Sequence, residues 1–164
     1  MIGNTTKEHV VSAEYSSIIF LNIRSLRCNH DQLEVFTNSL KTRPIAIALC
    51  ETWLSEKDPL SIYKLNGFQP LIVKNRQSCG GVLAIYVRQD FNYEIKESTK
   101  AVTDIEYLTI KPSKYKINLD LTLIYKPPAT NIGTFLESMD KLLEFTKVSN
   151  KSLVCGDFNI DTMQ

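Results

Sequence analysis

The fold is decided by the stretch Leu153-Val154-Cys155-Gly156-Asp157-Phe158-Asn159-Ile160-Asp161. An apolar run leads to Gly156, and an acid, an aromatic residue, an amide, an apolar residue and a second acid follow. A buried strand that ends at a polar site has this pattern, because glycine lets backbone or ligand approach closely. Strand alternation then directs Asp157 and Asn159 to one side and the apolar residues to the other. A strand that simply ends in a turn has the same pattern, so the rest of the chain must decide between a turn and a site.

Composition indicates one globular domain. The chain has 164 residues, of which 43% are hydrophobic and 23% charged, which disfavours a disordered chain. The formal net charge of +1 leaves nucleic-acid binding undecided, because phosphate binding needs only a local basic face. Two basic clusters, one at Lys74, Arg76 and Arg88 and one at residues 111–116, either form such a face or are solvated hairpin tips.

The cysteines and the chain start bear on location. The four cysteines lie far apart without a C-x-x-C pair, which disfavours a zinc site. Cys50 and Cys155 are predicted to be buried reduced thiols, as expected of an intracellular protein, nuclear or cytoplasmic. No apolar run reaches the length of a membrane span, so we expect no membrane partner. Residues 1–15 lack the features of a signal peptide and are predicted to be a loose polar leader before a domain at 16–164.

Hydrophobic periodicity predicts seven strands and two helices. The strands are predicted at residues 17–21, 45–50, 69–74, 82–87, 105–111, 117–125 and 152–155. Asn29 is predicted to cap the first helix and Thr134 the second. The expected buried positions of the two helices are Leu33, Phe36, Leu40, Phe135, Met139, Leu142 and Leu143. A Gly80-Gly81 turn and a Pro112-Ser113 turn are predicted to close two hairpins. Helix-linked buried strands beside antiparallel hairpins favour an α/β (α+β) layered sandwich with mixed sheets.

Four of the predicted strands end at polar residues, which are Asn22, Glu51, Tyr125 and the pair Asp157 and Asn159. Strand ends of this kind commonly line one crevice in α/β folds. Carboxylates and amides without histidine or cysteine suit Mg²⁺ or Mn²⁺ acting on a phosphate ester. Taken singly, Asn22 also fits a turn and Tyr125 fits a core position. For Trp53, packing in the core is preferred to the alternative of stacking on a base.

Five motifs carry a family resemblance. They are Asn22-Ile23-Arg24-Ser25-Leu26, Cys50-Glu51-Thr52-Trp53-Leu54, Gly80-Gly81-Val82, Ile124-Tyr125-Lys126-Pro127-Pro128 and Gly156-Asp157-Phe158-Asn159-Ile160-Asp161. In this order and approximate spacing they resemble the endonuclease/exonuclease/phosphatase superfamily. Within it, the chain looks most like the endonuclease domain that opens the reverse-transcriptase protein of non-LTR (LINE-type) retrotransposons. The resemblance covers residues 17–161.

The resemblance implies a four-layer sandwich of two mixed β-sheets flanked by helices. It also implies a divalent-metal-dependent phosphodiesterase that nicks target DNA to prime reverse transcription. Glu51 would hold Mg²⁺ (or Mn²⁺), and Asp157 would orient or deprotonate the attacking water. Asn22 and Asn159 would hold phosphate oxygens and carboxylates, and Tyr125 would donate its hydroxyl hydrogen to phosphate. The residues expected to bind substrate are Arg24 and Lys126.

The chain departs from the family pattern in two places. Arg24 stands where apurinic/apyrimidinic endonucleases carry an acid, which favours the retrotransposon branch. The terminal Ser-Asp-His motif is absent, so the domain is expected to be truncated at its C-terminus, with an unpaired sheet edge and marginal stability. A downstream reverse-transcriptase domain is the expected partner in the full-length protein. Two alternatives stay open: a decayed copy without catalysis, and a superfamily enzyme with another phosphate-ester substrate.

Overall fold

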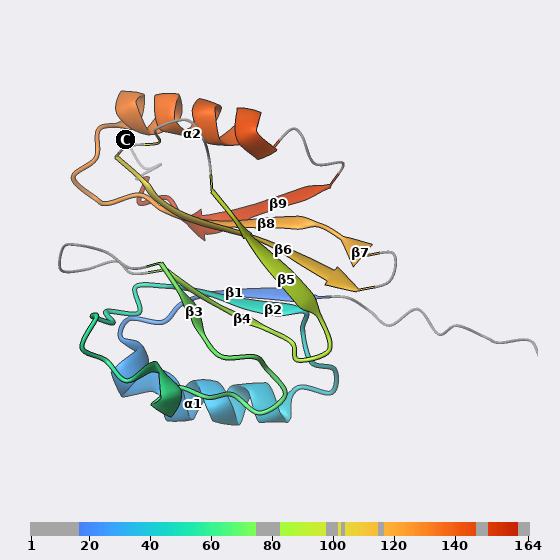
Figure 1. Cartoon of the computed structure of the whole chain (residues 1–164). Helices are drawn as coiled ribbons and strands as arrows, with labels where there is room; N and C mark the ends of the chain where they lie inside the picture. The colour runs from blue at the N-terminus through green and yellow to red at the C-terminus, as the bar shows by residue number, and fades with distance from the viewer. Residues whose placement is uncertain are drawn as a thin grey trace, which may run out of the picture.

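Two mixed β-sheets lie face to face in the middle of the molecule, and one helix covers the outer face of each (Figure 1). The computed structural model describes residues 17–74, 83–97, 102, 104–114, 117–146 and 151–160. The arrangement is the four-layer sandwich that the sequence predicts, with the layers in the order α1, first sheet, second sheet, α2.

The first sheet has the strand order β1-β2-β4-β3. Its strands are β1 (Ile18–Asn22), β2 (Ala46–Cys50), β3 (Ile72–Val73) and β4 (Ala84–Val87). β1 and β2 are parallel and are linked by helix α1 (Leu26–Ser39), whereas β4 runs antiparallel to both β2 and β3. A short 3-10 helix, η1 (Leu60–Ile62), lies in the connection from β2 to β3.

The second sheet repeats this plan with the order β5-β6-β8-β9. Its strands are β5 (Asn92–Lys96), β6 (Glu106–Lys114), β8 (Asp120–Tyr125) and β9 (Ser152–Asp157), and the short β7 (Ile117–Asn118) pairs with the end of β6. β8 and β9 are parallel and are linked by helix α2 (Ile132–Thr146). Each sheet therefore holds one parallel strand pair with a crossover helix, and the remaining pairs are antiparallel.

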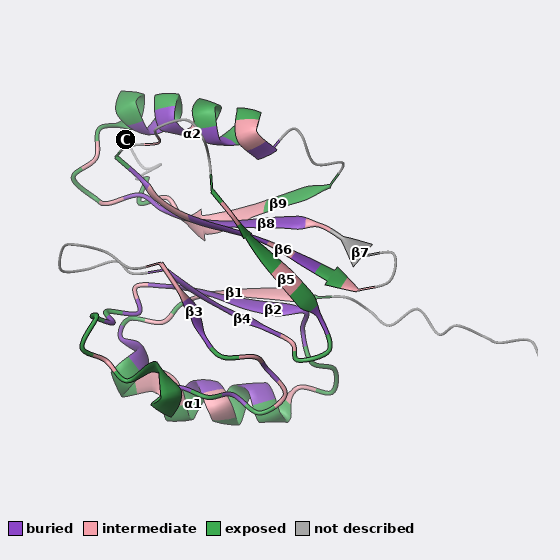
Figure 2. Ribbon diagram, viewed as in Figure 1, coloured by how far each residue is buried: buried purple, intermediate pink, exposed green. Residues whose placement is uncertain are grey.

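Alternation along the strands divides the core into three layers. The layer between the sheets contains Ala46, Ala48 and Cys50 of β2 and Leu121, Leu123 and Tyr125 of β8. Ile47 and Leu49 face α1, and Ile124 faces α2. Figure 2 shows the result: β2, β4 and β8 are buried throughout, while β5 is mostly exposed or half-buried.

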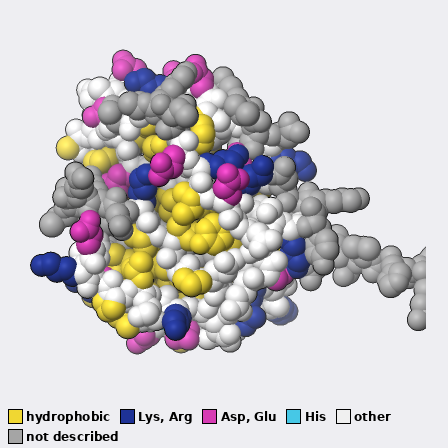
Figure 3. All heavy atoms as spheres, in the orientation of Figure 1, with side chains coloured by type: hydrophobic (Ala, Val, Ile, Leu, Met, Phe, Trp, Pro, Cys, Tyr) yellow, Lys and Arg dark blue, Asp and Glu magenta, His cyan; other side chains and the backbone are white. Residues whose placement is uncertain are grey.

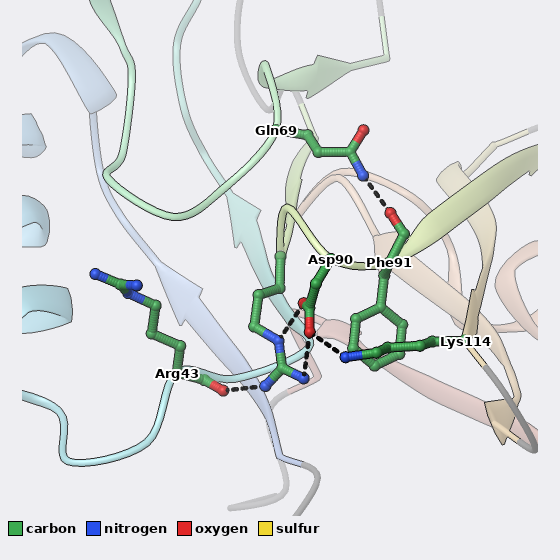
Figure 4. A network of polar contacts seen from close by, with 6 residues as sticks. Arg43, Gln69, Asp90, Phe91 and Lys114 are labelled. Carbon is green, nitrogen blue, oxygen red and sulfur yellow. Dashed lines mark hydrogen bonds and ion pairs between the residues drawn. The ribbon is translucent and has the colours of Figure 1, made fainter.

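A network of charges joins the two sheets at one end of the sandwich (Figure 4). Asp90 accepts hydrogen bonds from Arg88, which follows β4, at 2.6 Å, and from Lys114, which ends β6. Arg88 also donates to the backbone carbonyl of Arg43 at 2.8 Å. Burial alone would raise the pKa of Asp90, but the hydrogen bonds from the two cations lower it. One carboxylate thus ties both sheets together at the end where β2 and β8 begin.

The sheets have open edges. Within the described residues, β1, β3 and β9 each pair with a strand on one side only, as does β5. β1 and β9 are less buried than their partners β2 and β8, and Leu153 of β9 is 40% exposed. On the face that carries β3 and β5, hydrophobic side chains gather along the line between the sheets (Figure 3), and Ile95 of β5 is an exposed apolar residue. Unpaired edges with apolar surface are therefore present, and the predicted marginal stability stays a prediction.

Both helices begin earlier than predicted. α1 begins at Leu26, so Asn29 lies in its first turn and does not cap it. The Asn29 amide donates instead to the carbonyls of Ile23, Arg24 and Ser25, at 2.8, 3.0 and 3.2 Å, and so holds the turn between β1 and α1.

The second helix has a different cap from the predicted one. α2 begins at Ile132, and Asn131 caps it by accepting the N–H of Gly133 at 2.7 Å, so Thr134 lies inside the helix. Phe135 and Leu142 are buried as expected, whereas Leu143 is 37% exposed.

Two further local predictions are wrong, and one strand was not predicted. Phe36 of α1 is 40% exposed, because Leu26, Leu33 and Thr37 form the buried face of that helix. Pro112 is not in a turn: β6 continues to Lys114. β5 was not predicted, although Asn92-Tyr93-Glu94-Ile95-Lys96 alternates polar and apolar residues, because only two apolar residues carry that short pattern.

Some predictions concern residues outside the described part of the chain. These are the leader at 1–15, the Gly80-Gly81 turn and the basic residues Arg76 and Lys116. In the described part, no helix is both long and apolar enough to cross a bilayer.

Gly156→Ala tests the close approach of β8 and β9. A Cβ at position 156 would lie 2.0 Å from the carbonyl oxygen of Ile124, its neighbour on β8. The strand pair would have to separate, and we expect the variant to lose about 3 kcal/mol of unfolding free energy. Urea unfolding followed by circular dichroism measures the loss.

Gly133→Ala is the matched control. Its Cβ would meet only the side-chain oxygen of Asn131, at 3.2 Å, and alanine favours the helix. We expect a change within about 1 kcal/mol. Equal stability of the two variants would contradict the account of Gly156.

Candidate active site

The carboxyl ends of the two parallel strand pairs meet at one end of the sandwich. β1 lies against β9, and β2 lies against β8. Alternation places Cys50 and Tyr125 in the layer between the sheets, together with Phe20 of β1 and Cys155 of β9. The last residues of β1 and β9 are two positions further along, so Asn22 and Asp157 face the same layer. The site lies at the open end of the core between the sheets.

A hydrogen bond joins the two sheets at this end. The Asn22 amide donates to Oδ2 of Asp157 at 2.8 Å, although 135 residues separate the two in the chain. The other carboxylate oxygen, Oδ1, accepts the backbone N–H of Asn159 at 3.2 Å. The Asp157 carboxylate is therefore held in orientation by donors from both sides, which a group that must position a water requires.

Asn159 links the segment after β9 to the segment after β8. Its side-chain amide donates to the carbonyl of Lys126 at 2.8 Å, and its own φ of 42° lies in the left-handed region. Phe158 points to the other side, as alternation predicts, and its ring packs edge-on against Phe135 of α2 at 6.0 Å.

Tyr125 and Lys126 close the site from β8. Tyr125 is the register partner of Asp157 and is 7% exposed. Lys126 is 4% exposed, and its ammonium donates to the carbonyls of Pro127 and Asn159 at 3.3 and 3.4 Å. The structure thus gives Lys126 a part in holding the two loops together, and the substrate contact expected of it stays a prediction.

Glu51 leaves β2 on a strained backbone. Its φ is 53°, and the adjoining turn contains Arg24 and Ser25 with φ of 44° and 80°. Such values cost non-glycine residues of order 1–3 kcal/mol each and gather at functional sites. The N–H of Ser25 donates to the Glu51 carbonyl at 2.8 Å, which holds the two strained segments against each other. Arg24 is exposed beside them.

The Glu51 carboxylate is half-buried, and within the described part of the chain it has no hydrogen bond or ion pair. The positive φ takes Glu51 out of the alternation that would otherwise direct its side chain toward α1.

Residues 51–58, which we call the exit loop, are held in place by contacts that the sequence does not predict. At its start, the N–H of Leu26 donates to the Thr52 carbonyl at 2.8 Å. At its end, Asp58 accepts both a bidentate pair from Arg27, at 2.6 Å each, and the N–H of Ser55 at 2.6 Å. These hydrogen bonds lower the pKa of Asp58 and raise that of Arg27. A Ser-x-x-Asp pattern was the available signal for the local part of this anchor.

A larger cleft, of about 790 Å³, lies at the opposite end of the sandwich and includes Arg43, Arg88 and Asp90. Its only carboxylate already binds Arg88 and Lys114. We therefore place the candidate site at the other end, where the Asn22 amide binds the Asp157 carboxylate and where β2 ends next to Glu51. A groove of about 390 Å³ extends from Asn22 and Arg24 along β1 and α1.

No family model matches the chain, and no curated protein sequence matches it significantly. Solved structures do match. A truncated TDP2 from Caenorhabditis elegans has a TM-score of 0.60 at 19% identity, over 89% of this chain and 63% of that chain. The 3′ phosphatase NExo from Neisseria, bound to a product DNA hairpin, has a TM-score of 0.58 at 17% identity, over 87% of this chain and 57% of that one.

The endonuclease domain of TRAS1, a telomere-specific non-LTR retrotransposon, has a TM-score of 0.65 at 16% identity. That match covers 90% of this chain and 60% of the TRAS1 domain. The chain has the endonuclease/exonuclease/phosphatase fold. It spans less than two thirds of the length of each of these three structures. Its neighbours with this fold include a retrotransposon endonuclease and a 3′ phosphatase.

The donors at this end of the endonuclease/exonuclease/phosphatase fold suit a hard cation. Glu51 and Asp157 supply carboxylates and Asn22 an amide, which are the oxygen donors that Mg²⁺ and Mn²⁺ accept. Among the described residues, no group of three or more His, Cys, Asp or Glu side chains is placed to share a metal ion. A cation held by Glu51 would therefore keep most of its ligands as water, as Mg²⁺ does in sites with one or two carboxylates.

Burial disfavours the ionised form of the two thiols nearby. Cys50 is buried beneath the site and Cys155 is half-buried, and both are free thiols. Burial raises the pKa of Cys50 to about 12 and that of Cys155 to about 11. Both side chains act as core residues.

Asp58→Asn tests the anchor of the exit loop. Because the folded-state pKa of Asp58 is lowered, its carboxylate stabilises the fold above the unfolded-state pKa of about 3.9, and this stabilisation is lost as the pH falls toward the folded-state value. We expect the variant to be less stable than wild type by a constant amount from pH 7 to about pH 5, and the difference to shrink below about pH 4. Urea unfolding at several pH values measures it.

Asp31→Asn is the control, because Asp31 lies on α1, the helix that carries Arg27, and its side chain is fully exposed. It should leave stability unchanged over the same range. A deficit for Asp58→Asn that grows on acidification would contradict the assignment.

Proposed function

We propose that this chain is a divalent-metal-dependent phosphodiesterase of the retrotransposon endonuclease type, which nicks target DNA so that the exposed 3′ end primes reverse transcription. The observation that carries the proposal is the hydrogen bond from Asn22 to Asp157, with Tyr125 and Glu51 at the adjoining strand ends. The retrotransposon type is supported by Arg24, by the Tyr-Lys-Pro-Pro motif and by the likeness to the TRAS1 domain. A reverse-transcriptase domain in the full-length protein is part of this proposal.

The residues divide the work of hydrolysis among them. Asp157, held by Asn22 and Asn159, takes a proton from the water whose oxygen attacks phosphorus. The P–O3′ bond breaks, the 3′ oxygen gains a proton from solvent, and the nick leaves a 3′ hydroxyl and a 5′ phosphate. Tyr125 donates its hydroxyl hydrogen to a phosphate oxygen as negative charge develops there. A Mg²⁺ or Mn²⁺ ion at Glu51 would neutralise charge on the scissile phosphate.

Nicking of supercoiled plasmid tests the proposal. We expect open circles in Mg²⁺ or Mn²⁺ and none in EDTA. Glu51→Ala should abolish nicking by removing the metal ligand, and Asp157→Asn should slow it by about 10²- to 10⁴-fold because an amide cannot take the proton. Both the 164-residue chain and a longer protein that contains it are assayed.

Glu137→Ala, at an exposed position on α2, is the matched control and should nick like wild type. Circular dichroism confirms that each variant is folded. Absence of open circles at any metal concentration, for both lengths of protein, would contradict the proposal and favour a copy that binds nucleic acid without cutting.

A further inference from the structure

Trp53 stands out from the surface beside the candidate active site. Its side chain is 53% exposed, whereas its neighbours Thr52 and Leu54 are 0% and 6% exposed. The packing role expected from the sequence is therefore wrong. Its φ is 53°, a conformation that costs a bulky residue free energy. A strained backbone that leaves a large aromatic side chain exposed to solvent indicates a function for that side chain.

The exit loop presents Trp53 rigidly. The loop is hydrogen-bonded to the β1–α1 turn at its start and to Arg27 through Asp58 at its end. Between these anchors, Leu54 is buried against the α1 side of the first sheet. A ligand that meets the indole ring therefore orders no flexible segment, which removes a large part of the entropic cost of binding.

The surroundings of Trp53 combine charge with the exposed ring. Glu51, the candidate metal ligand, is two residues before it. Arg24 is exposed and adjoins Ser25, whose N–H binds the Glu51 carbonyl at 2.8 Å. A cation and an exposed aromatic ring beside a phosphate-handling site are the elements from which single-strand nucleic-acid sites are built.

We propose that Trp53 forms a nucleobase subsite. Its ring stacks on an unpaired base next to the phosphodiester that the Asp157 site acts on, and Arg24 binds a phosphate of the same strand. The base must be unpaired, because bases inside a duplex are already stacked on their neighbours. The identity of the polymer as DNA rests on the proposed function.

The fluorescence of the chain tests the subsite directly, because Trp53 is its single tryptophan. The chain is titrated in EDTA, where nothing is cut, with a short single-stranded oligodeoxynucleotide. A second oligomer of equal length has abasic sugars and therefore the same phosphates. We expect saturable quenching with the first oligomer, and weaker binding without quenching with the second.

Substitutions at Trp53 are compared by the anisotropy of a labelled oligodeoxynucleotide. Trp53→Ala should weaken binding about 5- to 150-fold, the loss expected when one base–aromatic stack is removed. Trp53→Phe should restore most of the affinity. Leu136→Ala, which truncates another side chain that is 55% exposed, should change nothing.

The subsite and the proposed function fail separately. Equal affinity for the base-containing and abasic oligomers, or wild-type affinity of Trp53→Ala, overturns the subsite even if plasmid is nicked. Base-dependent quenching supports the subsite even if neither the chain nor the longer protein nicks plasmid, a result that overturns the nicking function. The subsite is also overturned if a protein partner quenches the Trp53 fluorescence and no oligodeoxynucleotide does.

Discussion

The hydrogen bond between Asn22 and Asp157 is possible only because both sheets direct their parallel strand pairs the same way. β1 and β2 carry their carboxyl ends to the place where β8 and β9 carry theirs, and each pair is linked by a helix on the outside. Period-two alternation then directs the last residues of β1 and β9 into the layer between the sheets. The polar site is thus the end of the inter-sheet core, and the same apolar residues that stabilise the sandwich position it.

Close packing and backbone strain are placed at this end. Gly156 lets β9 approach the Ile124 carbonyl more closely than any side chain would permit. Arg24, Ser25 and Glu51 take left-handed conformations, which are sustained by hydrogen bonds between their segments and by the apolar layers beneath. The opposite end has ordinary surface chemistry, with Asp90 neutralised by Arg88 and Lys114.

The sequence predicts the layers and the set of strand ends well, because branched apolar runs and their polar exits are local signals. The sequence does not predict the backbone conformation or the side-chain exposure of the residues that follow the strands. The positive φ of Glu51 and the exposure of Trp53 depend on hydrogen bonds to the β1–α1 turn, which lies far away in the sequence. Arg27 and Asp58, 31 residues apart, carry no pattern that links them.

Other misses have local causes. Asn29 is a good cap by type, but Leu26 is fully buried and starts the helix one turn earlier. Pro112 suggested a turn, but β6 extends past it and pairs there with β5.

The central claim is that the ends of β1, β2, β8 and β9 form one cation site. Paramagnetic broadening by Mn²⁺ tests this claim most directly. In an amide NMR spectrum of the chain, low Mn²⁺ should broaden the signals of residues 22–25, 51–53, 125–126 and 157–159 first. Signals near Asp90 and Lys114 should stay sharp, and Glu51→Ala should abolish the localised effect. Broadening centred elsewhere, or spread evenly over the surface, would contradict the claim.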